Sequence, residues 1–175
     1  MAPETPFPCS YWVEPLVLLA GEYPGARSIV AARRKIEALL DCGIREIINL
    51  MASDERDFHG HLFTPYEPLV RPSRGRCRRF PIRDMDVPAP AAMQTILDAI
   101  DAALVSKRPV YVHCLAGVGR TGTVVGCWLI RHGRATGSNV IETIQALRQK
   151  DPHAHWPSPQ STVQIDMVRR WRRGR

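Results

Sequence analysis

Two hydrophobic patterns alternate along the chain and predict its strands and helices. Short, nearly continuous apolar runs are typical of buried strands, whereas apolar residues that recur every three or four positions are typical of one helical face. The short runs predict strands at residues 11–20, 44–50, 77–82 and 110–112. The helical spacing predicts helices at residues 27–42, 90–106 and 121–130, then one capped by Ser138 and a last one opened by Ser158 and Pro159.

The order of these elements predicts an α/β fold. Because helices and strands alternate, we expect a central, mostly parallel sheet of four to five strands with helices on both faces. Residues 110–112 are apolar at both sets of alternating positions, which places this strand in the middle of the sheet. The carboxyl end of such a strand is where open α/β sheets bind ligands.

The length of 175 residues suits one domain with a single core, so we expect one domain over residues 1–175. The proline-studded residues 1–9 are expected to be disordered or loosely attached, and residues 169–175 to form a basic tail. No apolar run is long enough to cross a bilayer, and the first ten residues do not resemble a secretory signal. Five cysteines without framework spacing favour reduced thiols and a cytoplasmic location.

The formal net charge of +7 is concentrated in arginine clusters. Five arginines fall within residues 169–175, which leaves the rest of the chain near +2. A second cluster comprises Arg71, Arg74, Arg76, Arg78, Arg79 and Arg83. Such clusters are more often solvated surface, but they can also attract an acidic partner. We expect a monomer, and we do not expect nucleic acid to be the partner.

The strongest chemical signal lies between the strand at residues 110–112 and a helix that begins near Arg120. The segment reads HCLAGVGRTG from His113, so that five residues separate Cys114 from Arg120. A strand that runs through a glycine loop into a helix turns backbone N–H groups inward at the positive end of the helix dipole, which forms an anion site. These surroundings favour the thiolate form of Cys114. The planar fork of Arg120 can hold two oxygens of a tetrahedral oxyanion.

The cysteine–arginine spacing is weak evidence by itself, because Cys77 and Arg83 have the same spacing. The residues between that pair include no glycine, and no helical pattern begins at Arg83. At Cys114 the spacing comes with two loop glycines, a strand before the loop and a helix after it. The sequence therefore predicts that Cys114 is a nucleophile directed at phosphorus and that Cys77 is a decoy.

A second stretch of chemical interest, RDMDVPAP, follows the strand predicted at residues 77–82. Cleavage of a phosphomonoester requires a proton for the departing oxygen, and a carboxylic acid near the thiolate can supply it. Asp84 and Asp86 are both candidates. The alternative is that both side chains only solvate the loop or cap the helix that follows.

These stretches resemble a known family. HCLAGVGRTG resembles the signature loop, HC-x5-R-[ST], of the cysteine-dependent protein tyrosine and dual-specificity phosphatases. PIRDMDVP resembles the acid loop of small members similar to the cyclin-dependent-kinase-associated phosphatase, and Asp84 matches the aspartate of that loop. Gln164, in SPQSTVQ, matches a glutamine that those enzymes place near the active site, with a surface glutamine as the alternative.

The resemblance implies hydrolysis in two steps through a phosphocysteine intermediate, without a metal or other cofactor. Cys114 attacks phosphorus and Asp84 protonates the leaving oxygen, after which water activated by Asp84 displaces the thiolate. Arg120 binds the phosphoryl oxygens together with the loop residues Leu115, Ala116, Gly117, Val118 and Gly119. Three further residues assist: His113 holds the loop, Thr121 assists departure of the thiolate, and Gln164 orients the water.

Alternative functions stay open. The substrate is expected to be a phosphorylated protein or peptide, with a phosphoinositide or another phosphate ester as the alternative. A rhodanese-like sulfurtransferase also cradles an anion with a cysteine loop, and a pseudophosphatase would only bind phosphoproteins. The histidine pairs His59/His61 and His153/His155 lack convincing further ligands, so we expect no metal site at either pair.

Overall fold

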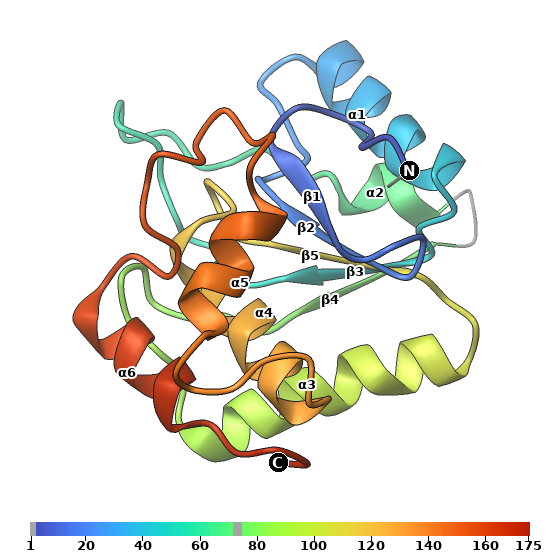
Figure 1. Ribbon diagram of the computed structural model, residues 1–175. Helices are drawn as coiled ribbons and strands as arrows, with labels where there is room; N and C mark the ends of the chain where they lie inside the picture. Colours follow the sequence, from blue (N-terminus) through green and yellow to red (C-terminus); the bar gives the residue numbers. More distant parts are fainter. Residues whose placement is uncertain (1–2, 72–74) are drawn as a thin grey trace.

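The computed structural model describes residues 3–71 and 75–175, so Arg74 of the predicted arginine cluster lies outside the described residues. Its strands are β1 (Ser10–Glu14), β2 (Leu18–Gly21), β3 (Glu46–Asn49), β4 (Arg76–Arg79) and β5 (Val110–His113). They form one sheet in the order β1-β2-β5-β3-β4 (Figure 1). The pairs β2–β5, β5–β3 and β3–β4 are parallel, whereas β1 pairs antiparallel with β2. The predicted mostly parallel sheet and the central position of β5 are confirmed.

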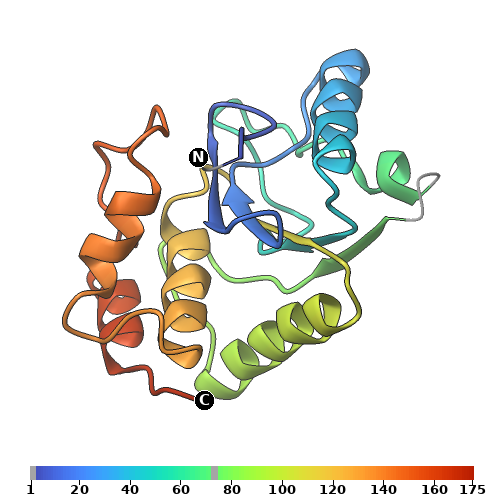
Figure 2. The same cartoon turned by 45° about the vertical axis from the view of Figure 1, so that its right-hand side comes forward.

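The helices are α1 (Ile29–Asp41), α2 (Glu67–Val70), α3 (Pro90–Val105), α4 (Gly119–Arg131), α5 (Val140–Leu147) and α6 (Thr162–Arg170). Figures 1 and 2 show α1 and α2 on one face of the sheet and α3, α4, α5 and α6 on the other. Each face has its own apolar core, and the larger one lies under α3 and α4. The prediction of helices on both faces is therefore confirmed.

The segment predicted as one strand at residues 11–20 is a hairpin of two strands. The chain turns at residues 15–17, where Leu16 has a φ of +61° and the Val17 N–H donates to the Glu14 carbonyl at 3.1 Å. Pro15 has no N–H to donate to a ladder, which explains why the strand cannot continue through it. The hairpin adds the antiparallel strand β1 at the sheet edge.

Two predicted helix starts are wrong. α6 begins at Thr162 rather than at Ser158, because Ser161 and Gln164 form a reciprocal capping box. The Ser158 hydroxyl is used elsewhere, as a donor to the Val118 carbonyl at 2.7 Å. At α5 the N-cap position is Asn139 rather than Ser138, and no side chain caps that helix.

Both ends of the described chain pack on the domain. Phe7, within the segment predicted to be loosely attached, is 9% exposed and packs edge-on against Tyr111. The basic tail begins inside α6, Trp171 is buried, and the Gly174 N–H donates to the Arg131 carbonyl at 2.9 Å. Within residues 3–71 and 75–175, no helix has the length and apolar character that a membrane span requires.

Candidate active site

The loop between β5 and α4 carries the predicted nucleophile. Cys114 directly follows β5 and is 3% exposed, and α4 begins five residues later at Gly119. Gly117 has a φ of +72°, and a Cβ there would lie 2.4 Å from the backbone of Gly21 at the end of β2. The Tyr23 N–H also donates to the Leu115 carbonyl at 2.9 Å. This loop, residues 114–120, is called the phosphate loop below, and the neighbouring strand β2 holds it in place.

Arg120 is held by acceptors on three sides. Its side chain is 1% exposed, and both terminal nitrogens bind the Glu55 carboxylate, with Nη2 to Oε2 at 3.1 Å. Nη1 also donates to the Ile82 carbonyl at 3.0 Å, and Nη2 lies 3.3 Å from Asp84 Oδ1. Burial by itself would lower the pKa of Arg120, but the hydrogen-bonded Glu55 and nearby Cys114 raise it above its usual value. The guanidinium is therefore charged and fixed in orientation.

Two buried polar atoms at the start of α4 have no hydrogen-bond partner among the described residues. They are Arg120 Nε and Thr121 Oγ1. An unpaired buried donor is costly, and nearly all such groups in folded proteins have a partner. Because Glu55 occupies the terminal nitrogens of Arg120, Nε is the donor that is left for a bound anion. Thr121 Oγ1 is available to a group in the phosphate loop.

His113 braces the phosphate loop from behind. Its Nε2 lies 2.5 Å from the Tyr66 hydroxyl, and its Nδ1 lies 3.0 Å from the Cys114 carbonyl. Burial lowers the pKa of His113 to about 3, so the ring is neutral at physiological pH. A neutral ring with these neighbours donates from Nδ1 to the Cys114 carbonyl and accepts from Tyr66 at Nε2.

The structure separates the two acid candidates. The Asp84 carboxylate reaches Arg120 and is otherwise exposed, with 69% of its side chain accessible. The Asp86 carboxylate instead accepts from the backbone N–H of Val87 at 2.8 Å. Met85 between them has a φ of +61°, so the backbone is in the left-handed region between the two aspartates. The position of Asp84 favours it as the acid.

Gln164 joins the last helix to the acid loop. It is fully buried, so the alternative of a surface glutamine is wrong. Its Oε1 accepts from the N–H groups of Gln160 and Ser161, both at 3.1 Å, and its Nε2 donates to the Asp86 carbonyl at 3.2 Å. A Cβ on Gly119 would lie 3.1 Å from Gln164 Oε1, so this amide also lies against the phosphate loop.

Three residues of the site are missing from the sequence predictions: Glu55, Tyr66 and Ser158. Glu55 follows the carboxyl end of β3, which neighbours β5 in parallel register. A carboxylate just beyond that strand end was the available signal, because parallel strands end at the same edge of the sheet. Tyr66 carried no such signal. Ser158, predicted to open the last helix, instead donates a hydrogen bond to the phosphate loop at Val118.

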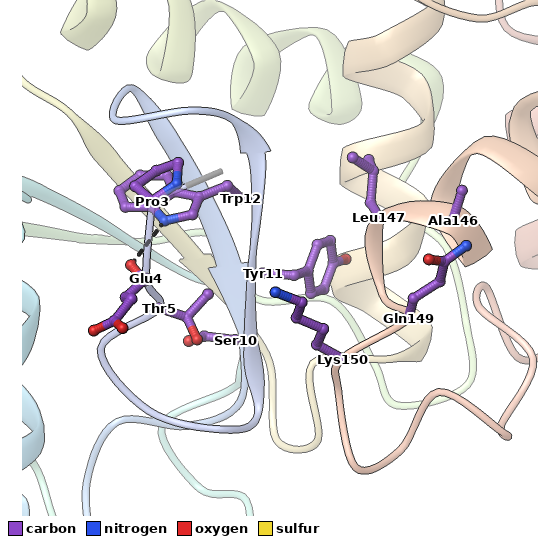
Figure 3. A pocket seen from close by; sticks show the side chains of 10 residues that line it. All are labelled: Pro3, Glu4, Thr5, Ser10, Tyr11, Trp12, Ala146, Leu147, Gln149 and Lys150. Atoms are coloured by element: carbon purple, nitrogen blue, oxygen red, sulfur yellow. Dashed lines mark hydrogen bonds between the residues drawn. The ribbon is translucent and has the colours of Figure 1, made fainter. Parts of the chain in front are cut away.

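The decoy Cys77 and one surface hollow contribute no group to the phosphate loop, although Cys77 Sγ lies 3.5 Å from the Tyr66 hydroxyl. Cys77 lies on the edge strand β4, and burial raises its pKa to about 11, as expected for an inert thiol. A hollow of about 530 Å³ lies between the N-terminal segment with β1 and the end of α5 (Figure 3). None of the predicted site residues lines this hollow.

A family described as "Polymorphic toxin system, DSP-PTPase phosphatase" matches residues 22–134 of the chain. Protein tyrosine phosphatase domain-containing protein 1 of Danio rerio is 30% identical over 139 residues, which cover 75% of this chain and 19% of that protein. Dual specificity protein phosphatase CDC14B of Mus musculus is 38% identical over 65 residues, 37% of this chain and 13% of that protein. The chain thus spans less than a fifth of the length of these two relatives.

Solved structures share the fold. A kinase associated phosphatase with its catalytic-site cysteine replaced by serine gives a TM-score of 0.70 at 20% identity, covering 86% of this chain and 83% of that one. The active form of Tk-PTP gives 0.67 at 18% identity, covering 93% and 95%. With the family match over residues 22–134, these findings confirm the resemblance that the sequence indicates. The chain belongs to the family of cysteine-dependent protein tyrosine and dual-specificity phosphatases.

Proposed function

We propose that this protein hydrolyses phosphomonoesters, as a protein tyrosine or dual-specificity phosphatase. The observation that carries the proposal is a pair of buried side-chain donors at the start of α4, Arg120 Nε and Thr121 Oγ1, which have no partner among the described residues. A bound phosphoryl group would accept from the first. The cysteine sulfur, as the leaving group of the second step, would accept from the other.

The reaction proceeds in two displacements at phosphorus. The Cys114 thiolate attacks and forms the sulfur–phosphorus bond while the bond to the leaving oxygen breaks, and Asp84 gives that oxygen its proton. The N–H groups of the phosphate loop and Arg120 stabilise the equatorial oxygens. Asp84 then takes a proton from water, which attacks phosphorus and releases phosphate and the Cys114 thiolate.

In this scheme, His113 and Gln164 hold other groups of the site in place and do not react themselves. Neutral His113 fixes the carbonyl of Cys114 and thereby the direction in which the loop N–H groups point. Both sides of the Gln164 amide are hydrogen-bonded, which supports a role in holding the acid loop at Asp86. Its second Nε2 hydrogen remains for the orientation of water in the hydrolytic step.

The names of the relatives and the state of the cysteines support a substrate class and a location. A phosphorylated protein or peptide is the proposed substrate, since the relatives described above are named protein phosphatases. One relative, from Arabidopsis thaliana, is named phosphatidylglycerophosphate phosphatase PTPMT2, so lipid phosphates belong in the assay; it is 28% identical over 123 residues, half of its length. All five cysteines are free, which supports a reducing, cytoplasmic location.

The deciding experiment measures phosphate release from phosphotyrosine, phosphoserine and phosphothreonine peptides and from lipid phosphates. We expect Cys114→Ser to abolish turnover and to retain vanadate binding. Asp84→Asn is expected to lower kcat on phosphotyrosine by roughly 10²- to 10⁴-fold, with a smaller loss for a leaving group that needs no proton. Asp86→Asn is the matched control. Turnover by Cys114→Ser would refute the mechanism, and an exchanged pattern of the two aspartates would reassign the acid.

A further inference from the structure

Three metal-ligating side chains converge outside the active site. Atoms of Cys9, Asp151 and His153, one sulfur, one carboxylate oxygen and one ring nitrogen, all lie within 4.8 Å of one another. The folded chain supplies the additional donors that the sequence did not reveal for His153. Ser10 and Lys150, the chain neighbours of Cys9 and Asp151, line the two sides of one hollow (Figure 3).

One ring nitrogen of His153 makes no hydrogen bond among the described residues and can bind a ligand. Its Nδ1 is buried, has no hydrogen-bond partner among the described residues, and lies 3.9 Å from Asp151 Oδ1. Trp156 stacks on the ring, with centroids 4.5 Å apart and planes 6° from parallel, which fixes the orientation of the ring. A buried imidazole nitrogen without a hydrogen-bond partner destabilises the fold unless a ligand binds to it.

Asp151 has the environment of a metal-binding carboxylate. Its Oδ2 accepts from Arg148 Nε at 3.3 Å, and its Oδ1 accepts from the His153 N–H at 2.8 Å. Carboxylates that bind metals are usually oriented by hydrogen bonds of this kind from groups that do not touch the metal. Arg148 also donates to the carbonyls of His153 and Trp156, so its charge is fixed beside Asp151 Oδ2, and Oδ1 is the oxygen that faces His153 Nδ1.

We propose that Cys9, Asp151 and His153 bind one divalent cation of the zinc type. Sulfur, nitrogen and oxygen ligands together suit zinc, and three protein ligands leave a fourth position for water. Binding forms a metal–sulfur bond in place of the Cys9 S–H bond, and the proton leaves to solvent. The thiolate then offsets one of the two positive charges, and the Asp151 carboxylate is shared between the cation and Arg148.

The site lies close to the phosphate loop but is not part of it. The Cys9 carbonyl accepts from the Glu22 N–H at 3.0 Å, and the next residue, Tyr23, donates to Leu115. A bound cation would tie the N-terminal segment to the loop between α5 and α6.

The test is titration of the metal-free full chain with Zn²⁺ by calorimetry and with Co²⁺ by absorbance, which reports a cobalt–thiolate bond. Every protein carries Cys114→Ser, so that the catalytic thiol cannot bind the metal. We expect one equivalent to bind, with affinity reduced more than about tenfold by Cys9→Ser and by His153→Ala. His155→Ala is the matched control, because this exposed histidine lies two positions away and outside the cluster.

Circular dichroism of the metal-free proteins checks that each variant is folded. Because Cys9→Ser and His153→Ala change different ligands, the test stays decisive even if one of them fails to fold. Loss of binding in either folded variant, with retention in His155→Ala, supports the site. The proposal is overturned if the Cys114→Ser protein binds no metal. It is equally overturned if Cys9→Ser and His153→Ala bind as tightly as the control, or if His155→Ala loses affinity to the same extent.

Discussion

At the scale of single residues, the site depends on how its one buried arginine is oriented. Glu55 holds both terminal nitrogens of Arg120, which leaves Nε without a partner among the described residues. In the proposed mechanism, this arrangement presents the Nε donor to a phosphoryl group before any substrate arrives. A catalytic side chain whose orientation is fixed in advance lowers the activation barrier, because it does not have to be reoriented during the reaction.

Removal of the Glu55 carboxylate should therefore impair catalysis. We expect Glu55→Ala to lower kcat/KM by roughly 10²-fold, because Arg120 loses its fixed direction and small misplacements of a catalytic group are costly. Steady-state kinetics on an aryl phosphate would measure this. Asp54→Asn is the matched control, since Asp54 is exposed and directly precedes Glu55. Equal activity of both variants would show that Arg120 does not need the brace.

The neutral state of His113 should make stability depend on pH. Its pKa in the folded protein is about 3, below the value of about 6.5 expected for an unfolded chain. The stability that comes from neutral His113 is therefore fully present above pH 6.5 and is lost as the pH falls below it. Between pH 7 and pH 5 the loss amounts to about 2 kcal/mol.

Urea unfolding of the wild type and of His113→Asn at both pH values measures this effect. The wild type should lose about 2 kcal/mol more than the variant on going from pH 7 to pH 5. His155→Asn, which changes an exposed histidine, should behave like the wild type. Identical losses in the wild type and His113→Asn would mean that His113 does not titrate as the burial of its ring requires.

At the scale of elements, local patterns predict what local interactions decide. β5 and α4 follow from the apolar run before Cys114 and the helical spacing after Arg120, and both lie within a few residues of their predicted bounds. The start of α6 was misplaced because a Ser-Pro pair and the Ser161/Gln164 capping box are both valid start signals, and only tertiary contacts use Ser158 elsewhere. Glu55 and Tyr66 contact Arg120 and His113, which lie 65 and 47 positions further along the chain, and no local pattern reports such contacts.

Gln164 couples two elements, and the two sides of its amide can be separated by substitution. Gln164→Glu keeps an acceptor for the capping box but loses the Nε2 donor to the Asp86 carbonyl, whereas Gln164→Met loses both. We expect both variants to lower kcat more on an ester whose leaving group needs a proton than on one that does not. The ratio of the two kcat values should change about tenfold.

Stability distinguishes the cap from the coupling. Gln164→Met should lower the free energy of unfolding by about 1 kcal/mol relative to the wild type, because it abolishes the acceptor at the helix start. If both esters slow down equally in both variants, Gln164 acts through the phosphate loop or the hydrolytic water instead of through the acid loop.

At the scale of the whole molecule, the fold places the phosphate loop at one end of α4 and the basic tail near the other end. α4 begins at the phosphate loop and ends at Arg131, whose carbonyl binds the Gly174 N–H of the tail. Its 13 residues span about 20 Å, more than twice the screening length of about 8 Å at physiological ionic strength. The sequence alone showed where the arginines fall along the chain, but the distance between the tail and Cys114 is a property of the folded molecule.

Charge near the site should therefore matter more than charge in the tail. Arg83 is exposed beside Asp84 and makes no ion pair among the described residues, whereas Arg173 lies against Gly133 beyond the end of α4. For an acidic phosphopeptide, Arg83→Ser should lower kcat/KM several-fold at low ionic strength and flatten its dependence on salt. Arg173→Ser removes the same charge and should leave both quantities within about twofold of the wild type. Equal effects of the two substitutions would show that the tail steers substrate over the full length of α4, and that the peptide extends along the protein far beyond the phosphate loop.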